Sequence, residues 1–119
     1  MNRVLVCDDE RKIRETYYDY LTAKGFEVVL ASNGREAVDK AGEECFDIIV
    51  LDVMMPEMDG YQALKIIHSS EKYPKVPVIA VTAQAMSGDR ERCIEAGATD
   101  YIAKPIDVDI LMNILRKYM

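Results

Sequence analysis

Five short apolar runs, most of them rich in valine and isoleucine, constrain the fold of this chain more than any other feature. The runs span residues 4–7, 27–31, 47–51, 78–81 and 101–103. Most lack polar alternation, which is typical of strands that are buried on both faces of a parallel sheet. We therefore expect a parallel sheet that is covered by helices on both sides.

Segments with helical spacing separate the runs and follow the last one. The first segment ends at Gly25, a typical helix stop, and the second opens at Asn33 with Glu36 three residues later, which is a capping-box pattern. The other three predicted helices begin near Asp59, Ser87 and Asp107, and the one from Ser87 stops at Gly97. The inner face of the last helix is expected to hold Ile110, Leu111, Ile114, Leu115 and Tyr118.

The chain therefore repeats the order strand then helix five times. Right-handed crossovers convert this order into an α/β three-layer sandwich, with five helices around a five-stranded parallel sheet. Five strands of this kind suit the flavodoxin-like order 2-1-3-4-5. The length of 119 residues fits a single domain over residues 1–119.

Charge and apolar content narrow the possible partners. The net charge of −6 argues against direct nucleic-acid binding, which needs a basic patch. The longest uninterrupted apolar run, residues 48–51, is too short to cross a membrane, and the N-terminus shows no signal peptide. The three cysteines show no zinc-binding pattern. We expect a cytoplasmic protein that binds a divalent cation or another protein.

The acidic residues gather where such a sheet binds ligands, beyond the carboxyl ends of its strands. The point at which the strand order reverses lies between the first and third strands. Asp8, Asp9 and Glu10 follow the first strand, and Asp52 follows the apolar part of the third. Carboxylates so close together cost free energy unless a cation lies among them. Their oxygens suit Mg²⁺, and Mn²⁺ would fit similarly.

Two other strand ends add groups that complement a phosphoryl group. Thr82, a hydroxyl donor, ends the fourth run, and Lys104 follows the fifth. A cation site beside a hydroxyl and a lysine can bind a phosphoryl group, and Asp52 can act as its nucleophile. Each of these residues alone is unremarkable; their coincidence at the carboxyl ends of different strands carries the prediction.

Four motifs and their spacing resemble the receiver domains of two-component response regulators, the CheY-like domains. They are "VLVCDDE", "DIIVLDVMMPEMDG", "VIAVTA" and "GATDYIAKP". The resemblance covers essentially the whole chain. It implies that Asp52 accepts a phosphoryl group from a phosphohistidine of a histidine kinase or phosphotransfer protein. It also implies self-catalysed phosphorylation and dephosphorylation of Asp52, not turnover of a separate substrate.

The resemblance assigns further roles. Asp9 would bind Mg²⁺ directly, Asp8 mainly through water, and the backbone carbonyl of Met54 would complete the protein ligands. Thr82 and Lys104 would contact the phosphoryl oxygens. The Lys104–Pro105 bond would be cis, and Tyr101 falls at an aromatic switch position.

The implied output is a face formed by the fourth helix, the fifth strand and the fifth helix, which would contact a downstream protein. Ala85, Met86 and Ile106 lie near that face. The Met54 side chain offers no polar group to orient a water molecule toward a phosphorylated Asp52, so we expect slow to moderate dephosphorylation of Asp52. The chain is expected to be either a stand-alone receiver or a fragment of a longer protein, such as a hybrid kinase.

Three alternatives use related topology. A phosphatase of the haloacid-dehalogenase type needs an Asp-x-Asp pair, whereas the spaced pair here is Asp8 and Glu10. A flavin-binding module needs Ser, Thr and Gly after the first strand, where "CDDERK" repels phosphate. A degenerate receiver that only docks would not need the set of five residues Asp8, Asp9, Asp52, Thr82 and Lys104.

Overall fold

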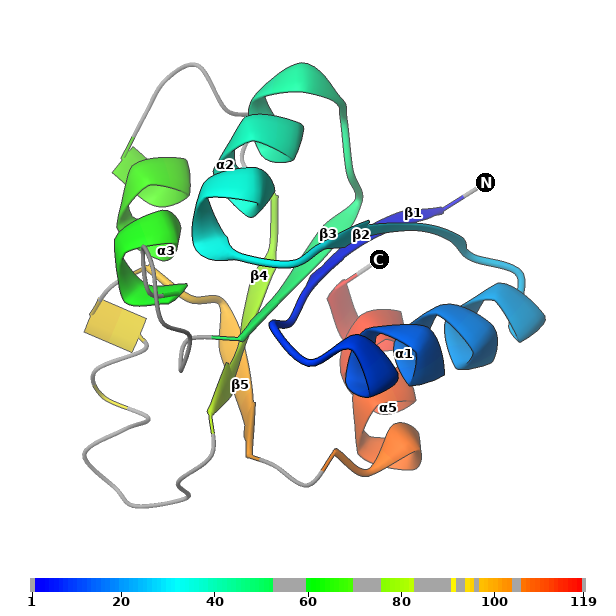
Figure 1. Cartoon of the computed structure of the whole chain (residues 1–119). Helices are drawn as coiled ribbons and strands as arrows, with labels where there is room; N and C mark the ends of the chain where they lie inside the picture. The colour runs from blue at the N-terminus through cyan, green and yellow to red at the C-terminus, as the bar shows by residue number, and fades with distance from the viewer. Residues whose placement is uncertain are drawn as a thin grey trace.

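The computed structural model describes residues 2–52, 60–69, 76–82, 91, 94–95, 97–103 and 106–118. Its five strands form one parallel sheet in the order β2-β1-β3-β4-β5, as the sequence predicts (Figure 1). The strands are β1 (Arg3–Cys7), β2 (Glu27–Ala31), β3 (Ile48–Asp52), β4 (Val78–Thr82) and β5 (Asp100–Ala103). Each predicted strand boundary lies within one residue of the observed one, and β3 includes Asp52.

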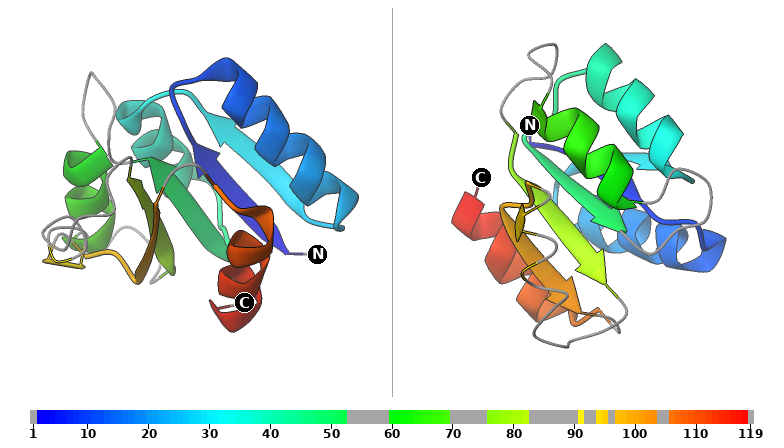
Figure 2. Two further views of the ribbon diagram at one scale, coloured as in Figure 1. Left: turned by 90° about the horizontal axis from the view of Figure 1, so that it is seen from below. Right: turned by 90° about the vertical axis from the view of Figure 1, so that its left-hand side faces the viewer.

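Four described helices cover the two faces of this sheet (Figures 1 and 2). They are α1 (Arg11–Ala23), α2 (Gly34–Glu43), α3 (Gly60–Ser69) and α5 (Val108–Tyr118). Helices α2 and α3 lie on one face, and α1 and α5 lie on the other. Most of the helix predicted from Ser87 lies outside the described residues, but Gly97, its predicted stop, has the positive φ of 113° that favours glycine. No helix in the described ranges is long and apolar enough to span a membrane.

Successive residues of each central strand pack into different apolar clusters, because side chains alternate across a strand. Leu5, Cys7, Ile49 and Leu51 pack with α2 and α3. Val4, Val6, Ile48 and Val50 pack with α1 and α5. The central strands therefore have no solvent-facing side, which explains why their sequences lack polar alternation.

The inner face of α5 differs from the prediction at one position. Leu111 and Leu115 are buried as expected, but Ile110 is 51% exposed and Met112 is buried in its place. Ile110 and Met112 lie on opposite edges of the apolar stripe of this helix, so periodicity alone does not select between them. The unbranched methionine side chain adapts to the irregular space at its edge.

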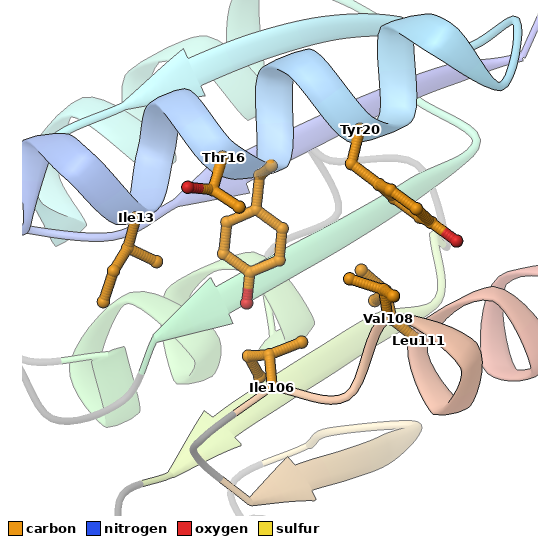
Figure 3. A pocket seen from close by; sticks show the side chains of 7 residues that line it. Ile13, Thr16, Tyr20, Ile106, Val108 and Leu111 are labelled. Carbon is orange, nitrogen blue, oxygen red and sulfur yellow. The ribbon is translucent and has the colours of Figure 1, made fainter.

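A cavity of about 470 Å³ lies between α1 and the start of α5 (Figure 3). Helices α2 and α3 pack side by side on the opposite face, whereas the described parts of α1 and α5 make little contact with each other. Side chains of α1 and of the segment from Ile106 to Leu111 therefore line an open space and not a closed helix–helix interface.

Candidate phosphoacceptor and metal site

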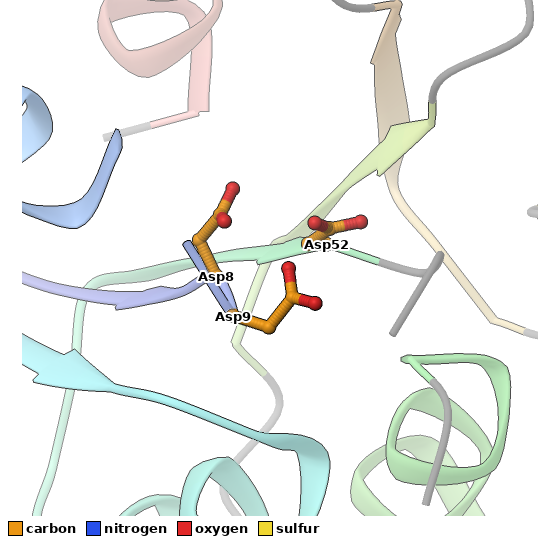
Figure 4. Close-up of side chains that lie close together, drawn as sticks. All are labelled: Asp8, Asp9 and Asp52. Carbon is orange, nitrogen blue, oxygen red and sulfur yellow. The ribbon is translucent and has the colours of Figure 1, made fainter. Parts of the chain in front are cut away.

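The acidic residues of the site come together at the carboxyl ends of β1 and β3 (Figure 4). In the parallel pairing of these strands, Cys7 lies beside Leu51, so the residues that follow, Asp8 and Asp52, lie at the same edge of the sheet. One carboxylate oxygen from each of Asp8, Asp9 and Asp52 lies within 4.8 Å of the others. The structure therefore assembles the three side-chain metal ligands that the sequence predicts.

Burial distinguishes these acids from the other acids of the chain. Apart from Cys7 and Tyr17, the polar side chains that are buried in the described ranges are Asp8, Asp52 and Thr82, each with at most 1% of its surface exposed. Asp9 is exposed and forms the solvent-facing side of the cluster. All three buried groups stand at strand ends, where burial costs free energy that packing alone does not offset.

The loop after β1 is held in place by hydrogen bonds around Asp8. The Asp8 carboxylate accepts a hydrogen bond from the backbone N–H of Glu10 at 2.9 Å, and this turn leads directly into α1. The Asp8 N–H donates to the carbonyl of Ala31 at the end of β2. The guanidinium of Arg14 donates to the Asp8 carbonyl at 2.9 Å. The acidic loop is therefore fixed to both β2 and α1.

Arg14 was not predicted from the sequence to be part of this arrangement. Arg14 lies one helical turn beyond Glu10. Its side chain contacts the loop only because α1 begins at Arg11. A cation at this position, six residues after Asp8, is the signal that was available in the sequence. Arg14 positions the loop through the backbone carbonyl of Asp8 and not through a carboxylate.

The pKa values of two buried neighbours, Cys7 and Tyr17, reflect the negative potential of the site. Burial raises the pKa of the Cys7 thiol, and Asp52 and Asp8 raise that pKa further. Burial also raises the pKa of the Tyr17 hydroxyl, with further contributions from Asp8 and Asp52. Both groups are kept protonated because another negative charge here is unfavourable. A dianionic phosphoryl group therefore needs cations beside it.

The donor set fits Mg²⁺, which prefers carboxylate oxygens and keeps several water ligands. Among the described residues, no sulfur or imidazole ligand belongs to this cluster, so its donor set does not fit the chemistry of a zinc or copper site. Asp8, Asp9 and Asp52 are the described residues that would hold the ion. The predicted fourth ligand, the carbonyl of Met54, lies outside the described residues.

Thr82 and Tyr101 lie on neighbouring strands, and Thr82 directly follows Val81, the residue that pairs with Asp52. Thr82 pairs with Ala103 and Tyr101 pairs with Ala80, and strand alternation places the Thr82 and Tyr101 side chains on the same face of the sheet. Tyr101 is half-buried and packs against the cluster beneath α2 and α3. Lys104 and Pro105 lie outside the described residues, as do Ala85 and Met86.

The chain is similar to known proteins over nearly its whole length. Residues 4–116 match the family described as the response regulator receiver domain. The polar-differentiation response regulator DivK of Brucella anthropi is 35% identical over 98% of this chain and 94% of its own length. The signal transduction histidine-protein kinase BarA of Escherichia coli is 45% identical over 76% of this chain, and the match spans only 10% of that kinase.

One solved structure of similar shape contains a metal ion. The receiver domain of a sensor histidine kinase from Pseudomonas aeruginosa has a magnesium ion coordinated in its active-site cleft. It is 36% identical to this chain, covers 98% of it and 96% of its own length, and has a TM-score of 0.89. The fold, the acidic cluster and the family match agree: the chain belongs to the receiver domains of two-component response regulators.

Proposed function

We propose that the chain is a phospho-accepting receiver in which Asp52 takes a phosphoryl group from a phosphohistidine on a partner protein. One observation carries this proposal: the buried side chains Asp8, Asp52 and Thr82 all stand at the carboxyl edge of one sheet. The donor would be a histidine kinase or a phosphotransfer protein. The reaction is a self-catalysed modification of Asp52, so the chain is not an enzyme that turns over a separate substrate, and we place it in the cytoplasm.

In the transfer, a carboxylate oxygen of Asp52 forms a bond to phosphorus while the bond from phosphorus to the histidine nitrogen breaks, and the nitrogen keeps the electron pair. The rigid end of β3 fixes the direction of attack, because Ile48 to Leu51 are fully packed. A bound Mg²⁺ supplies positive charge that offsets the developing charge on the phosphoryl oxygens. We assign Lys104 to the same oxygens and Thr82 as their hydroxyl donor.

The proposed output begins at Thr82. A phosphoryl group on Asp52 draws the Thr82 hydroxyl toward it, and Tyr101, on the same face of the sheet, turns into the space that this movement opens. The change then alters the face formed by the predicted fourth helix, β5 and α5, which contacts the downstream protein. The half-buried position of Tyr101 supports this role because its ring packs against the core and is also partly accessible to solvent.

Phosphorylation by a small donor tests the assignment of Asp52. The protein is incubated with acetyl phosphate and Mg²⁺ and then measured by intact-protein mass spectrometry. We expect one added phosphoryl group on the wild type and none on Asp52→Asn. Asp39→Asn, which changes an exposed acid of α2, is the matched control and should be labelled like the wild type. Labelling that persists in Asp52→Asn would overturn the proposal.

A further inference from the structure

The cavity between α1 and α5 is lined by apolar and weakly polar side chains. The lining residues are Ile13, Thr16, Tyr17, Tyr20, Ile106, Val108 and Leu111 (Figure 3). None of them carries a charge at neutral pH. Its volume of about 470 Å³ falls in the range of small-molecule sites in proteins.

The cavity is open to solvent at its outer side. Thr16 of α1 and Val108 of α5 are exposed, and Val108 keeps 37% of its surface accessible. Leu111 and Tyr17 are buried, so the lining side chains range from exposed ones at the mouth to buried ones deeper in the cavity. A ligand can therefore enter without separating the two helices from the sheet.

A buried polar group among these apolar side chains lacks a partner. The Tyr17 side chain is only 5% exposed, and its hydroxyl oxygen has no hydrogen-bond partner within the described ranges of the chain. A buried hydroxyl without a partner costs free energy, because it has lost its hydrogen bonds to water. A bound group that accepts a hydrogen bond from Tyr17 would recover that cost.

We propose that this cavity binds a small, neutral, largely aromatic or aliphatic molecule with one hydrogen-bond acceptor, such as a ketone or an ester, which accepts from the Tyr17 hydroxyl. The described lining residues are uncharged and so disfavour a tightly held ion of either sign, because an ion would lose its water without gaining a partner among them. An anion is opposed further by Asp8 and Asp52, whose charges act on Tyr17. This site is separate from the acidic cluster and does not depend on phosphorylation of Asp52.

A fluorescent ketone tests the proposal. The probe is prodan, a neutral naphthalene ketone whose emission moves to shorter wavelength in apolar surroundings. A fixed low concentration of prodan is titrated with the full chain, and the dissociation constant is expected on the order of 0.1 mM. Tyr17→Phe keeps the ring but removes the donor, and it should weaken binding about fivefold.

Two aspartate substitutions on α5 provide a matched pair. Val108 lines the cavity, whereas Ile110, two residues away and 51% exposed, does not. We expect Val108→Asp to abolish saturable binding and Ile110→Asp to leave the affinity unchanged. Circular dichroism verifies that each variant is folded.

Three results would each overturn the site: no saturable signal with the wild type, equal weakening by the two aspartate variants, or an unchanged affinity in Tyr17→Phe. These outcomes are distinguishable from failure of the phosphoacceptor assignment, because prodan binding is measured without phosphodonor or metal.

Discussion

At the scale of single residues, Cys7 and Tyr17 lie on opposite faces of the sheet and respond to the same acids. Cys7 packs beneath α2 and α3 and donates a hydrogen bond from its thiol to the carbonyl of Asn33 at 3.2 Å. Tyr17 packs beneath α1 and α5. Asp8 and Asp52 raise the pKa of both groups. The negative charges of the acidic site therefore affect groups on both faces of the sheet. These two groups are suitable for testing the electrostatics of the site.

Replacing Tyr17 with phenylalanine should stabilise the ligand-free protein. The change removes a buried hydroxyl that has no partner among the described residues and keeps the packed ring. We expect the free energy of unfolding to rise by about 1 kcal/mol. Urea unfolding measures the change, and Tyr18→Phe, at a residue 45% exposed, should have almost no effect. A loss of stability in Tyr17→Phe would show that the hydroxyl makes a favourable contact.

The raised pKa of Cys7 predicts a loss of stability at alkaline pH. Above the ordinary thiol pKa of 9.0, the unfolded chain releases this proton while the folded chain keeps it. The unfolded state then binds fewer protons, so the free energy of unfolding falls by up to about 1.4 kcal/mol per pH unit. Tyr17 contributes in the same direction above its ordinary pKa of 10.0.

The measurement is urea unfolding of the wild type and Cys7→Ala at pH 8 and pH 10. The stability advantage of the wild type over Cys7→Ala should shrink by about 1.4 kcal/mol over this range. Cys45→Ala removes an exposed thiol and should follow the wild type at both pH values. Parallel pH profiles for wild type and Cys7→Ala would refute the raised pKa of Cys7.

At the scale of secondary structure, the central strands β1, β3 and β4 were predictable because both of their faces are buried. Sequence composition records such burial directly, so the strand order and the positions of Asp8, Asp52 and Thr82 could be inferred from the strand ends. The roles of Arg14 and Tyr17 could not, because they depend on how α1 packs over the sheet. The burial of Met112 in place of Ile110 on α5 also depends on how the helix packs over the sheet.

The start of α2 shows how local chemistry refines a predicted element. The Asn33 side chain accepts a hydrogen bond from the Glu36 N–H at 2.8 Å, as the capping pattern predicts. The Glu36 carboxylate accepts from the Ser32 hydroxyl at 2.8 Å, so it returns to the residue before the cap. The carbonyl of Asn33 also receives the Cys7 thiol. The cap therefore joins α2 to the end of β1, next to the acidic loop.

Removing this cap should destabilise the protein. Asn33→Ala leaves the Glu36 N–H without its side-chain acceptor, and we expect a cost of about 1 kcal/mol. Thermal or urea unfolding gives the value. Asn113→Ala, at an exposed position within α5, is the control and should be neutral or slightly stabilising. If both substitutions had the same effect, the cap would contribute nothing specific.

At the scale of the whole molecule, the sheet holds charges together that repel each other. Asp8, Asp9 and Asp52 lie within 4.8 Å because β1 and β3 are neighbours and both end at this edge. The apolar clusters on the two faces of the sheet supply the free energy that keeps this arrangement folded. The fold therefore stores an electrostatic cost that a bound cation removes.

This arrangement predicts that Mg²⁺ stabilises the folded chain. A ligand that binds only the folded state adds about 2.7 kcal/mol at a concentration one hundred times its dissociation constant. Thermal unfolding with MgCl₂ should therefore show a higher midpoint than with EDTA. Asp9→Asn removes one proposed ligand at an exposed position, so this variant should gain much less stability from Mg²⁺.

The comparison of increments separates metal binding from simple relief of repulsion. Asp9→Asn also removes a negative charge from the cluster, so in EDTA it should be more stable than the wild type. Asp19→Asn removes an exposed charge on α1, away from the cluster, and should keep the full Mg²⁺ increment. If Mg²⁺ raised the midpoints of all three proteins equally, the stabilisation would come from general screening of a chain with a net charge of −6, and the acidic cluster would not be its binding site.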